Sequence, residues 1–317
     1  MITRRKQSTM IKKDMTFSEA FDSFIRAKET ESGLSKETIK TYKIHISKFI
    51  EILDCSDVLC SKMDREDYIF FVSQLQNEDI KSVTVSSYCR SIKAFLNYCF
   101  DKELINIFKV TVPKADTTVK SIYTDEELQR LLQKREDLTF GQYQTYVFIN
   151  FAIGTGLRLG SMLNIQVKNY DPKAMTININ TTKRRAGLVK YINKQLSDML
   201  NKYIALFELN PTDYLFCVEG GAIMSARNMQ QNVERYNNLI CNVDKKSIHL
   251  FRHTFAVKYI RSGGNVLDLQ KLLQHHDLNT TMNYLKDLGL DTKNAVNVFN
   301  PQLEFNVKKS TSRKRKM

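Results

Sequence analysis

Hydrophobic positions in the first third of the chain recur every three or four residues, the spacing that gathers them on one face of an α-helix. Four such stretches follow one another, around Phe17–Ile25, Ile39–Leu53, Tyr68–Leu75 and Val85–Cys99. The first opens on a capping box, Thr16-Phe17-Ser18-Glu19, which predicts a helix start there. The pattern therefore predicts a compact bundle of four short helices over about residues 15–110.

Helices and strands are both predicted after residue 120. A second capping box, Thr124 to Glu127, precedes one helix, and the apolar segment Tyr143–Ile153 predicts a buried helix that Gly154-Thr155-Gly156 breaks. Apolar and polar residues then alternate, with Met175, Ile177 and Ile179 on one face of a predicted strand. Leu188–Ile192 predicts a second strand, joined to the first by a basic hairpin loop.

Helical spacing returns over Leu196–Leu206, after Ser225, around His249, over Val266–Leu273 and around Tyr284. The predicted fold is mostly α with a small antiparallel sheet: a helical bundle followed by an α+β domain over about residues 121–300. Residues 111–120 contain Pro113 and lose the helical period, so they predict a linker between the two domains.

Composition places the chain among ordinary globular proteins. Of its 317 residues 42% are hydrophobic and 26% charged, enough to bury a sizeable core in two domains. No apolar run is long enough to span a bilayer and no signal-peptide core follows the basic start, so we expect a cytoplasmic protein without membrane association. Six cysteines without a Cys-x-x-Cys pair favour reduced core residues over disulfides or a metal site.

The formal net charge of +14 suggests a polyanionic partner, but the charge is concentrated at the ends. Residues 1–13 carry five of these charges and residues 308–317 carry six, which leaves three for the rest of the chain. We expect a basic arm over residues 1–14 and a basic tail over 301–317. Charge alone allows two interpretations equally: tails that bind nucleic acid, or tails that keep the chain soluble.

A set of polar residues in the second domain carries candidate chemistry. His249 and Arg252 lie three residues apart and share a helix face, while His275 stands nine residues before Tyr284. Arg158 directly follows Thr155-Gly156-Leu157. Two fixed positive charges, two imidazoles and a phenol are groups that can hold a phosphodiester and attack its phosphorus.

In this order and spacing, these residues resemble the tyrosine recombinase (phage-type integrase) family. The resemblance covers nearly the whole chain and is strongest from Ser121 to Tyr284. It implies a SAM-like core-binding bundle that clamps DNA, followed by a catalytic domain. It also implies a site-specific recombinase or integrase that cleaves and rejoins DNA through a 3′-phosphotyrosine and a Holliday junction, without a cofactor or metal.

The resemblance assigns a role to each site residue. Tyr284 would be the nucleophile, Arg158 and Arg252 would hold the non-bridging oxygens, and His249 and His275 would donate hydrogen bonds or move the tyrosine proton. Lys183, in the predicted hairpin loop Thr181–Arg185, would be the general acid for the leaving 5′ oxygen. The neighbouring His253 and His276 are expected to be structural or solvent-facing.

Each residue taken singly has an ordinary structural alternative. Arg158 could form an interdomain salt bridge, Arg252 an ion pair on a helix surface, and Tyr284 could pack in a core. Lys183 could belong to a plain basic loop that touches the DNA backbone. Only the complete set, in order, favours catalysis.

Candidate DNA contacts are basic residues on the bundle and on the hairpin loop: Lys36, Lys40, Lys43, Lys81, Arg90, Lys93, Arg184 and Arg185. The alternative for each is the solvated face of an amphipathic helix or loop. Two positions depart from the family pattern: Ser161 stands where a carboxylate usually orients the first arginine, and Gln274 replaces the usual glycine before the second histidine.

The expected partners are double-stranded DNA at recombination sites and three further copies in a homo-tetramer, with a DNA-bending accessory protein left open. Ala295–Phe299 could dock on a neighbouring protomer or pack in cis. With about fourteen residues before the first helix, no large arm-binding domain is expected, which favours a simple recombinase or transposon-type enzyme of a mobile genetic element. Three alternatives remain: a type IB topoisomerase, a catalytically silent DNA-binding regulator and, remotely, a phosphatase with a tyrosine intermediate.

Overall fold

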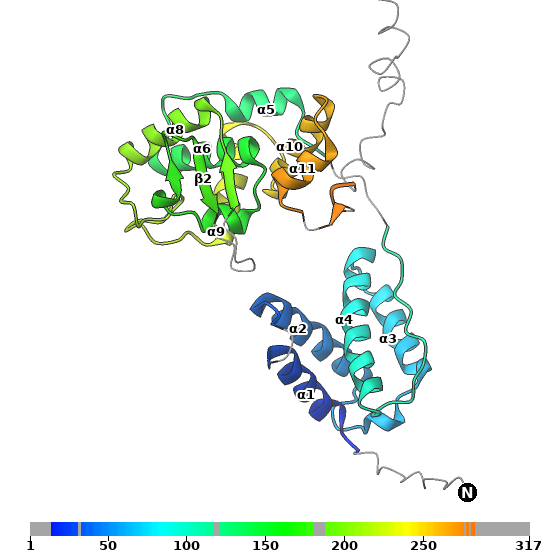
Figure 1. Ribbon diagram of the computed structural model, residues 1–317. Coiled ribbons are helices and arrows are strands. Elements are labelled where there is room, and N and C mark those ends of the chain that lie inside the picture. Colours follow the sequence, from blue (N-terminus) through cyan, green and yellow to red (C-terminus); the bar gives the residue numbers. More distant parts are fainter. Residues whose placement is uncertain are drawn as a thin grey trace, which may run out of the picture. The chain divides into compact units, whose positions relative to one another are not determined.

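The computed structural model describes residues 14–30, 33–116, 121–179, 188–275, 277–278 and 280–282. The chain divides into two compact units, Met1–Thr118 and Val119–Met317, each with its own hydrophobic core (Figure 1). The predicted class is confirmed: a helical first unit is followed by a second unit that combines helices with a small antiparallel sheet.

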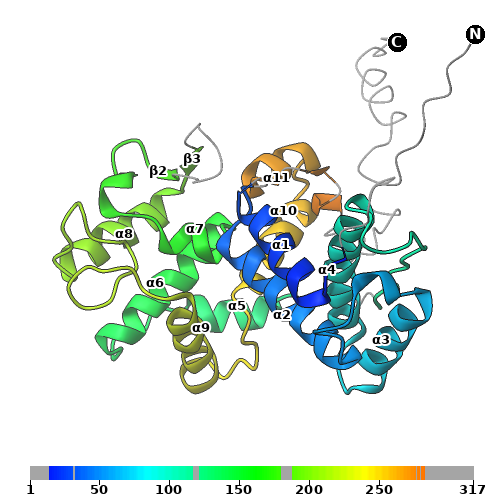
Figure 2. The same ribbon diagram turned by 90° about the horizontal axis from the view of Figure 1, so that it is seen from below.

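The first unit is a bundle of four α-helices: α1 (Phe17–Thr30), α2 (Lys36–Leu53), α3 (Arg65–Asn77) and α4 (Ser82–Asp101), with a 3-10 turn at Cys60–Lys62. The capping box predicted at Thr16 starts α1, and a further capping box starts α3. Thr16 and Glu19 exchange side-chain to backbone hydrogen bonds at α1, and Asp64 caps α3. Helix α2 packs against α1, α3 and α4, and its neighbour α4 lies beside it in Figure 2.

The core of this unit is aromatic, with Phe24 meeting Phe95 edge to face at 5.5 Å and Phe49 meeting Phe71 at 4.9 Å. The predicted linker is attached to the bundle over its first part. Tyr68 donates a hydrogen bond to the Thr111 carbonyl, and the Asp116 amide donates to the Ser82 hydroxyl. The segment up to Asp116 therefore belongs to the bundle.

The second unit is built around α6 (Phe140–Thr155), which packs against α5 (Asp125–Leu132), α8 (Lys194–Leu206), α9 (Ala226–Arg235) and α10 (His249–Arg261). The remaining α-helices are α7 (Leu159–Leu163) and α11 (Val266–Leu273). A 3-10 turn spans Val167–Asn169, and a π-helical turn, Tyr236–Ile240, continues α9. Helix α11 packs on α10, as Figure 1 shows in orange and gold.

Helix α6 continues through Gly154 to Thr155, and Gly156 is its C-cap. Of the predicted break Gly154-Thr155-Gly156, only Gly156 therefore ends the helix. Gly156 has φ +64°, and an added Cβ would lie 2.6 Å from the Phe255 ring. Only glycine fits this left-handed, crowded position, which also brings the end of α6 against α10.

The sheet has the strand order β1 (Tyr170–Asp171), β2 (Thr176–Ile179), β3 (Leu188–Tyr191), all antiparallel. The predicted strands are β2 and β3, and β1 was missed because two residues carry no period. Ile177 and Ile179 are buried as expected, but Met175 is not part of their face. It occupies a turn with φ +51°, before the strand starts, and is partly exposed.

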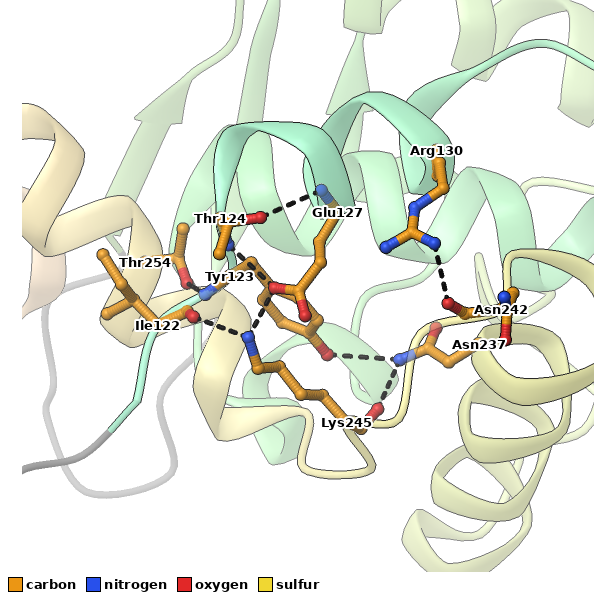
Figure 3. A network of polar contacts seen from close by, with 9 residues as sticks. All are labelled: Ile122, Tyr123, Thr124, Glu127, Arg130, Asn237, Asn242, Lys245 and Thr254. Atoms are coloured by element: carbon orange, nitrogen blue, oxygen red, sulfur yellow. Dashed lines mark hydrogen bonds and ion pairs between the residues drawn. The ribbon is translucent and has the colours of Figure 1, made fainter.

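A polar network anchors the start of the second unit to α10 and to the loop before it (Figure 3). Lys245 donates to the Ile122 carbonyl and forms an ion pair with Glu127, which belongs to the capping box of α5. The Tyr123 amide donates to the Thr254 hydroxyl, and the Tyr123 ring stacks on Phe251 at 4.8 Å. The start of the second unit is thus fixed to the helix that carries His249 and Arg252.

All six cysteines are buried and free, as predicted. Among the described residues, no cluster of side chains could hold a metal ion, and no helix is long and apolar enough to cross a membrane.

Candidate active site

Arg252 lies at the centre of the candidate site. Its guanidinium donates to the Gly156 carbonyl at 2.7 Å, to the Leu273 carbonyl at 2.7 Å, and to Nε2 of His275 at 2.7 Å. The residue is only 4% exposed, so the structural alternative of an ion pair on a helix surface does not hold. Its two carbonyl acceptors are at the C-terminal ends of α6 and α11, where helix dipoles favour a cation.

His275 follows α11 and is 6% exposed. An arginine can only donate, so Nε2 of His275 accepts from Arg252 and the imidazole is neutral. The proton is then on Nδ1, which donates to the Thr281 hydroxyl at 2.8 Å. Burial and the charges of Arg252 and Arg158 lower the pKa of His275 to about 4, in agreement with a neutral imidazole.

Arg158 reaches the same place from the junction of α6 and α7. It is the N-cap residue of α7, its side chain is exposed, and Nη1 lies 3.5 Å from the Gln274 carbonyl, next to His275. Ser161, where the family pattern has a carboxylate, lies within α7. The acceptor that the structure gives Arg158 is the Gln274 backbone carbonyl. Arg158 therefore adds an exposed cation next to His275, which the buried Arg252 also contacts.

Gln274 has φ +56° and caps α11 in the left-handed region. This conformation explains why a glycine suits the position, since a side chain there is strained. The backbone nevertheless turns as a glycine would allow, and the turn carries His275 to Arg252. The departure at Gln274 leaves the convergence of these groups intact.

His249 opens α10 and is exposed at its first turn, one helical turn before Arg252. His253 is buried within the same helix, which agrees with a structural role and excludes a solvent-facing one. The structure thus places Arg252 in contact with His275, and Arg158 in contact with the residue before His275. His249 lies on α10, the helix that also carries Arg252.

Several predicted site residues lie outside the described part of the chain: the nucleophile candidate Tyr284, the general acid candidate Lys183, the loop residues Arg184 and Arg185, His276, and the Ala295–Phe299 segment. Their roles stay predictions.

The remaining DNA-binding candidates are exposed on the first unit. Lys36, Lys40 and Lys43 lie along one side of α2, and Lys81, Arg90 and Lys93 lie on or beside α4, the helix packed against it. Lys43 forms an ion pair with Glu29 at 3.0 Å, which reduces its free charge. The other five side chains are exposed to solvent, and their contact with DNA stays a prediction.

The structure adds two residues that sequence reasoning missed. Thr281, fully buried, holds the Nδ1 side of His275. Lys190, on β3, donates to the Leu272 carbonyl at 2.9 Å, and burial together with the charge of Arg252 lowers its pKa to about 8. A signal for Lys190 existed, because the alternation of β3 puts it on the same face as the apolar Leu188 and Ile192.

Comparison with known proteins identifies related sequences over both units. The model of the phage integrase family matches residues 121–289, and the model of the phage integrase SAM-like domain matches residues 16–115. Tyrosine recombinase XerC of Staphylococcus aureus (strain USA300 / TCH1516) is 23% identical over 269 residues, which cover 83% of this chain and 90% of the relative.

Solved structures share the fold. The Tn1549 transposon integrase in complex with a circular intermediate DNA aligns with a TM-score of 0.68 and 19% identity, covering 85% of this chain and 95% of that one. The XerH site-specific recombinase, in a post-cleavage complex with palindromic difH substrate, aligns with a TM-score of 0.69 and 20% identity, covering 89% and 84%. At these identities the likeness concerns the fold.

Proposed function

The chain belongs to the phage integrase family of tyrosine recombinases, because the family model matches more than half of it, and we propose that it is a site-specific DNA recombinase. It would cleave and rejoin DNA strands through a phosphotyrosine intermediate. The observation that carries this proposal is the meeting of Arg158, Arg252 and His275 around one turn. The topoisomerase and silent-regulator alternatives are not favoured by the relatives found.

The two arginines are suited to the phosphate. Charge grows on the non-bridging oxygens as a nucleophile approaches phosphorus, and fixed donors that face this charge lower the barrier. Two backbone carbonyls already hold the Arg252 guanidinium in place, so it is preorganised before DNA binds. Arg158, which is exposed, would bind the other oxygen. Loss of one such donor typically costs about 10²–10³ in rate.

Tyr284 would supply the nucleophile. Its phenolic oxygen would form a bond to phosphorus, the bond from phosphorus to the 5′ oxygen would break, and the 5′ hydroxyl would leave. The phosphotyrosine keeps the energy of the broken bond, so a different 5′ hydroxyl can reverse the step without ATP.

Proton transfer would be divided between the ends of the reaction. His275 is neutral, and its one acceptor nitrogen, Nε2, holds the Arg252 guanidinium, so it would take up the phenolic proton only after that hydrogen bond has opened. Lys183 would protonate the leaving 5′ oxygen, and His249 would donate to the phosphate from the first turn of α10.

The first unit would clamp the duplex. Lys36, Lys40, Lys81, Arg90 and Lys93 provide exposed cations on two packed helices, and neutralised phosphates would make binding weaken steeply with salt. A tetramer on two paired sites would complete the recombination reaction, with Ala295–Phe299 docked on the neighbouring copy.

The test is covalent trapping. A duplex site would be selected from a random-sequence pool by binding to Tyr284→Phe protein, labelled, and incubated with wild type and with that variant in EDTA. We expect an adduct that survives denaturant for wild type only. An adduct with Tyr284→Phe would indicate another nucleophile, and a strict magnesium requirement would indicate other chemistry.

A further inference from the structure

Strand β3 buries a lysine and exposes its apolar neighbours. Lys190 is 4% exposed, whereas Val189 and Tyr191 on either side are 48% and 76% exposed. Lys190 pairs across the sheet with the fully buried Ile177. Burying an ammonium group without an opposite charge is costly, so an apolar residue would suit this position better if packing were its only task.

The contacts of Lys190 do not offset this cost with an opposite charge. Its Nζ donates to the Leu272 carbonyl at 2.9 Å and lies 5.4 Å from the centre of the Phe255 ring. Among the residues that the structure describes, Lys190 makes no ion pair, and the charge that acts on it is the like charge of Arg252. The sheet therefore adds a cation beside Arg252 where repulsion opposes it.

Three consecutive carbonyls at the end of α11 each accept from a different cation. Leu272 accepts from Lys190 at 2.9 Å, Leu273 from Arg252 at 2.7 Å, and Gln274 from Arg158 at 3.5 Å. These carbonyls belong to the last turn of the helix, whose dipole is negative there. The next residue is His275, so the three cations together define the turn from which the imidazole reaches Arg252.

We propose that Lys190 is a positioning residue for the reaction: it fixes strand β3 to the end of α11 and so keeps Arg252, Arg158 and His275 in the arrangement that receives the phosphate. This inference rests on the proposed function. Lys190 acts through the turn, because its contacts are the Leu272 carbonyl and the Phe255 ring. Its ammonium group adds positive charge near Arg252 and binds the first of the three carbonyls of the turn.

A plain structural anchor is the alternative, and the chain contains a matched control for it. Lys245 also donates to a backbone carbonyl, that of Ile122, and its Nζ lies 5.5 Å from the centre of the Tyr123 ring. It differs in having a carboxylate partner, Glu127. Loss of Lys245 should weaken the fold without changing the chemistry.

The experiment compares Lys190→Met, Lys190→Arg and Lys245→Met with wild type in the full chain. Three quantities are measured: the single-turnover rate of adduct formation on the selected duplex, the Kd for that duplex, and the Tm. For Lys190→Met we expect a rate about 10–100-fold lower, since misplaced site groups cost about this much, with an unchanged Kd. Its Tm should be unchanged or a few degrees higher, because a buried charge is removed.

Lys190→Arg keeps the charge and should react faster than Lys190→Met. Lys245→Met should lower the Tm by a few degrees and react at the wild-type rate below its unfolding transition. A wild-type rate for Lys190→Met would overturn the inference. The inference would also be overturned if Lys190→Met were slow, its Tm were lower than that of wild type, and Lys190→Arg reacted no faster than Lys190→Met. Absence of an adduct with wild type would instead overturn the proposed function.

Discussion

Two lysines in the second unit have nearly the same local contacts and opposite electrostatic settings. Lys190 and Lys245 each donate to a backbone carbonyl and lie over an aromatic ring, but Lys245 is neutralised by Glu127 while Lys190 lies beside Arg252 (Figure 3 shows the Lys245 network). The charge of Lys245 is thus balanced within the protein. Arg158, Lys190 and Arg252, here called the cation cluster, place like charges near one another, so a bound anion would stabilise them most, as a phosphate site requires.

The largest expected effect comes from replacing the planar guanidinium of Arg252 by another positively charged group. Arg252→Lys keeps a cation but cannot serve two carbonyls and a phosphate oxygen with one planar group. We expect adduct formation about 10²–10³-fold slower, measured in single turnover on the selected duplex.

The matched control is Arg130→Lys, because Arg130 also donates to a backbone carbonyl, that of Asn242, but outside the cation cluster. It should react at the wild-type rate. Equal losses in the two variants would mean that the rate reports general damage to the second unit.

His275 and Glu127 should lower the free energy of unfolding in different pH ranges as the solution is made more acidic. The pKa of His275 is lowered to about 4 from an ordinary value of 6.5, so unfolded chains bind an extra proton between these values. The stabilisation is complete above pH 6.5 and is lost as pH falls toward 4, by at most about 3 kcal/mol at about 1.36 kcal/mol per pKa unit. Urea denaturation of wild type and His275→Gln across this range measures it.

Glu127 gives the comparison for that window. Partial burial raises its pKa, but hydrogen bonds from Lys245 and from the Thr124 backbone outweigh burial and the pKa is lowered. Its contribution is therefore present above the ordinary value of 4.5 and is lost only below it. Glu127→Gln should leave the fall between pH 6.5 and pH 4.5 in place. A flat profile in wild type over that interval would contradict the neutral His275.

At neutral pH, Glu127→Gln should lower the free energy of unfolding by about 1–2 kcal/mol, because it leaves the partly buried Lys245 without its partner. Thermal unfolding measures this loss. The rate of adduct formation at 25 °C should stay at the wild-type value, since the charge removed lies outside the cation cluster. A rate that fell with Glu127→Gln would mean that the two clusters are coupled.

The smallest effect is expected at the turn itself. Gln274→Gly removes left-handed strain of about 1–2 kcal/mol and adds back about 0.5–1 kcal/mol of unfolded-chain entropy. We expect a gain of about 0.5–1 kcal/mol in unfolding free energy, with the cleavage rate unchanged because the carbonyls keep their directions. A loss of stability would show that the Gln274 side chain contributes more than its backbone strain costs.

Much of the fold could be predicted because it is written in local periods. Capping boxes at Thr16 and Thr124 start helices where they were expected, and the alternation around Ile177 and Ile179 identified a strand. The two-residue β1 and the turn at Met175 escaped, since neither is long enough to show a period. The resemblance to a family selected Arg158, Arg252 and His275 from among many similar side chains.

The sequence by itself determined the elements, the order of the two units and the candidate residues of the site, because these depend on neighbours three or four positions away or on motif spacing. Only the tertiary structure decided that Arg252 is buried, that Nε2 of His275 accepts its hydrogen bond, and that Lys190 binds the same end of α11. Burial and tautomer depend on which distant segments meet. Here the ends of α6 and α11 and the middle of β3 meet, and their carbonyls and charges set the state of each group.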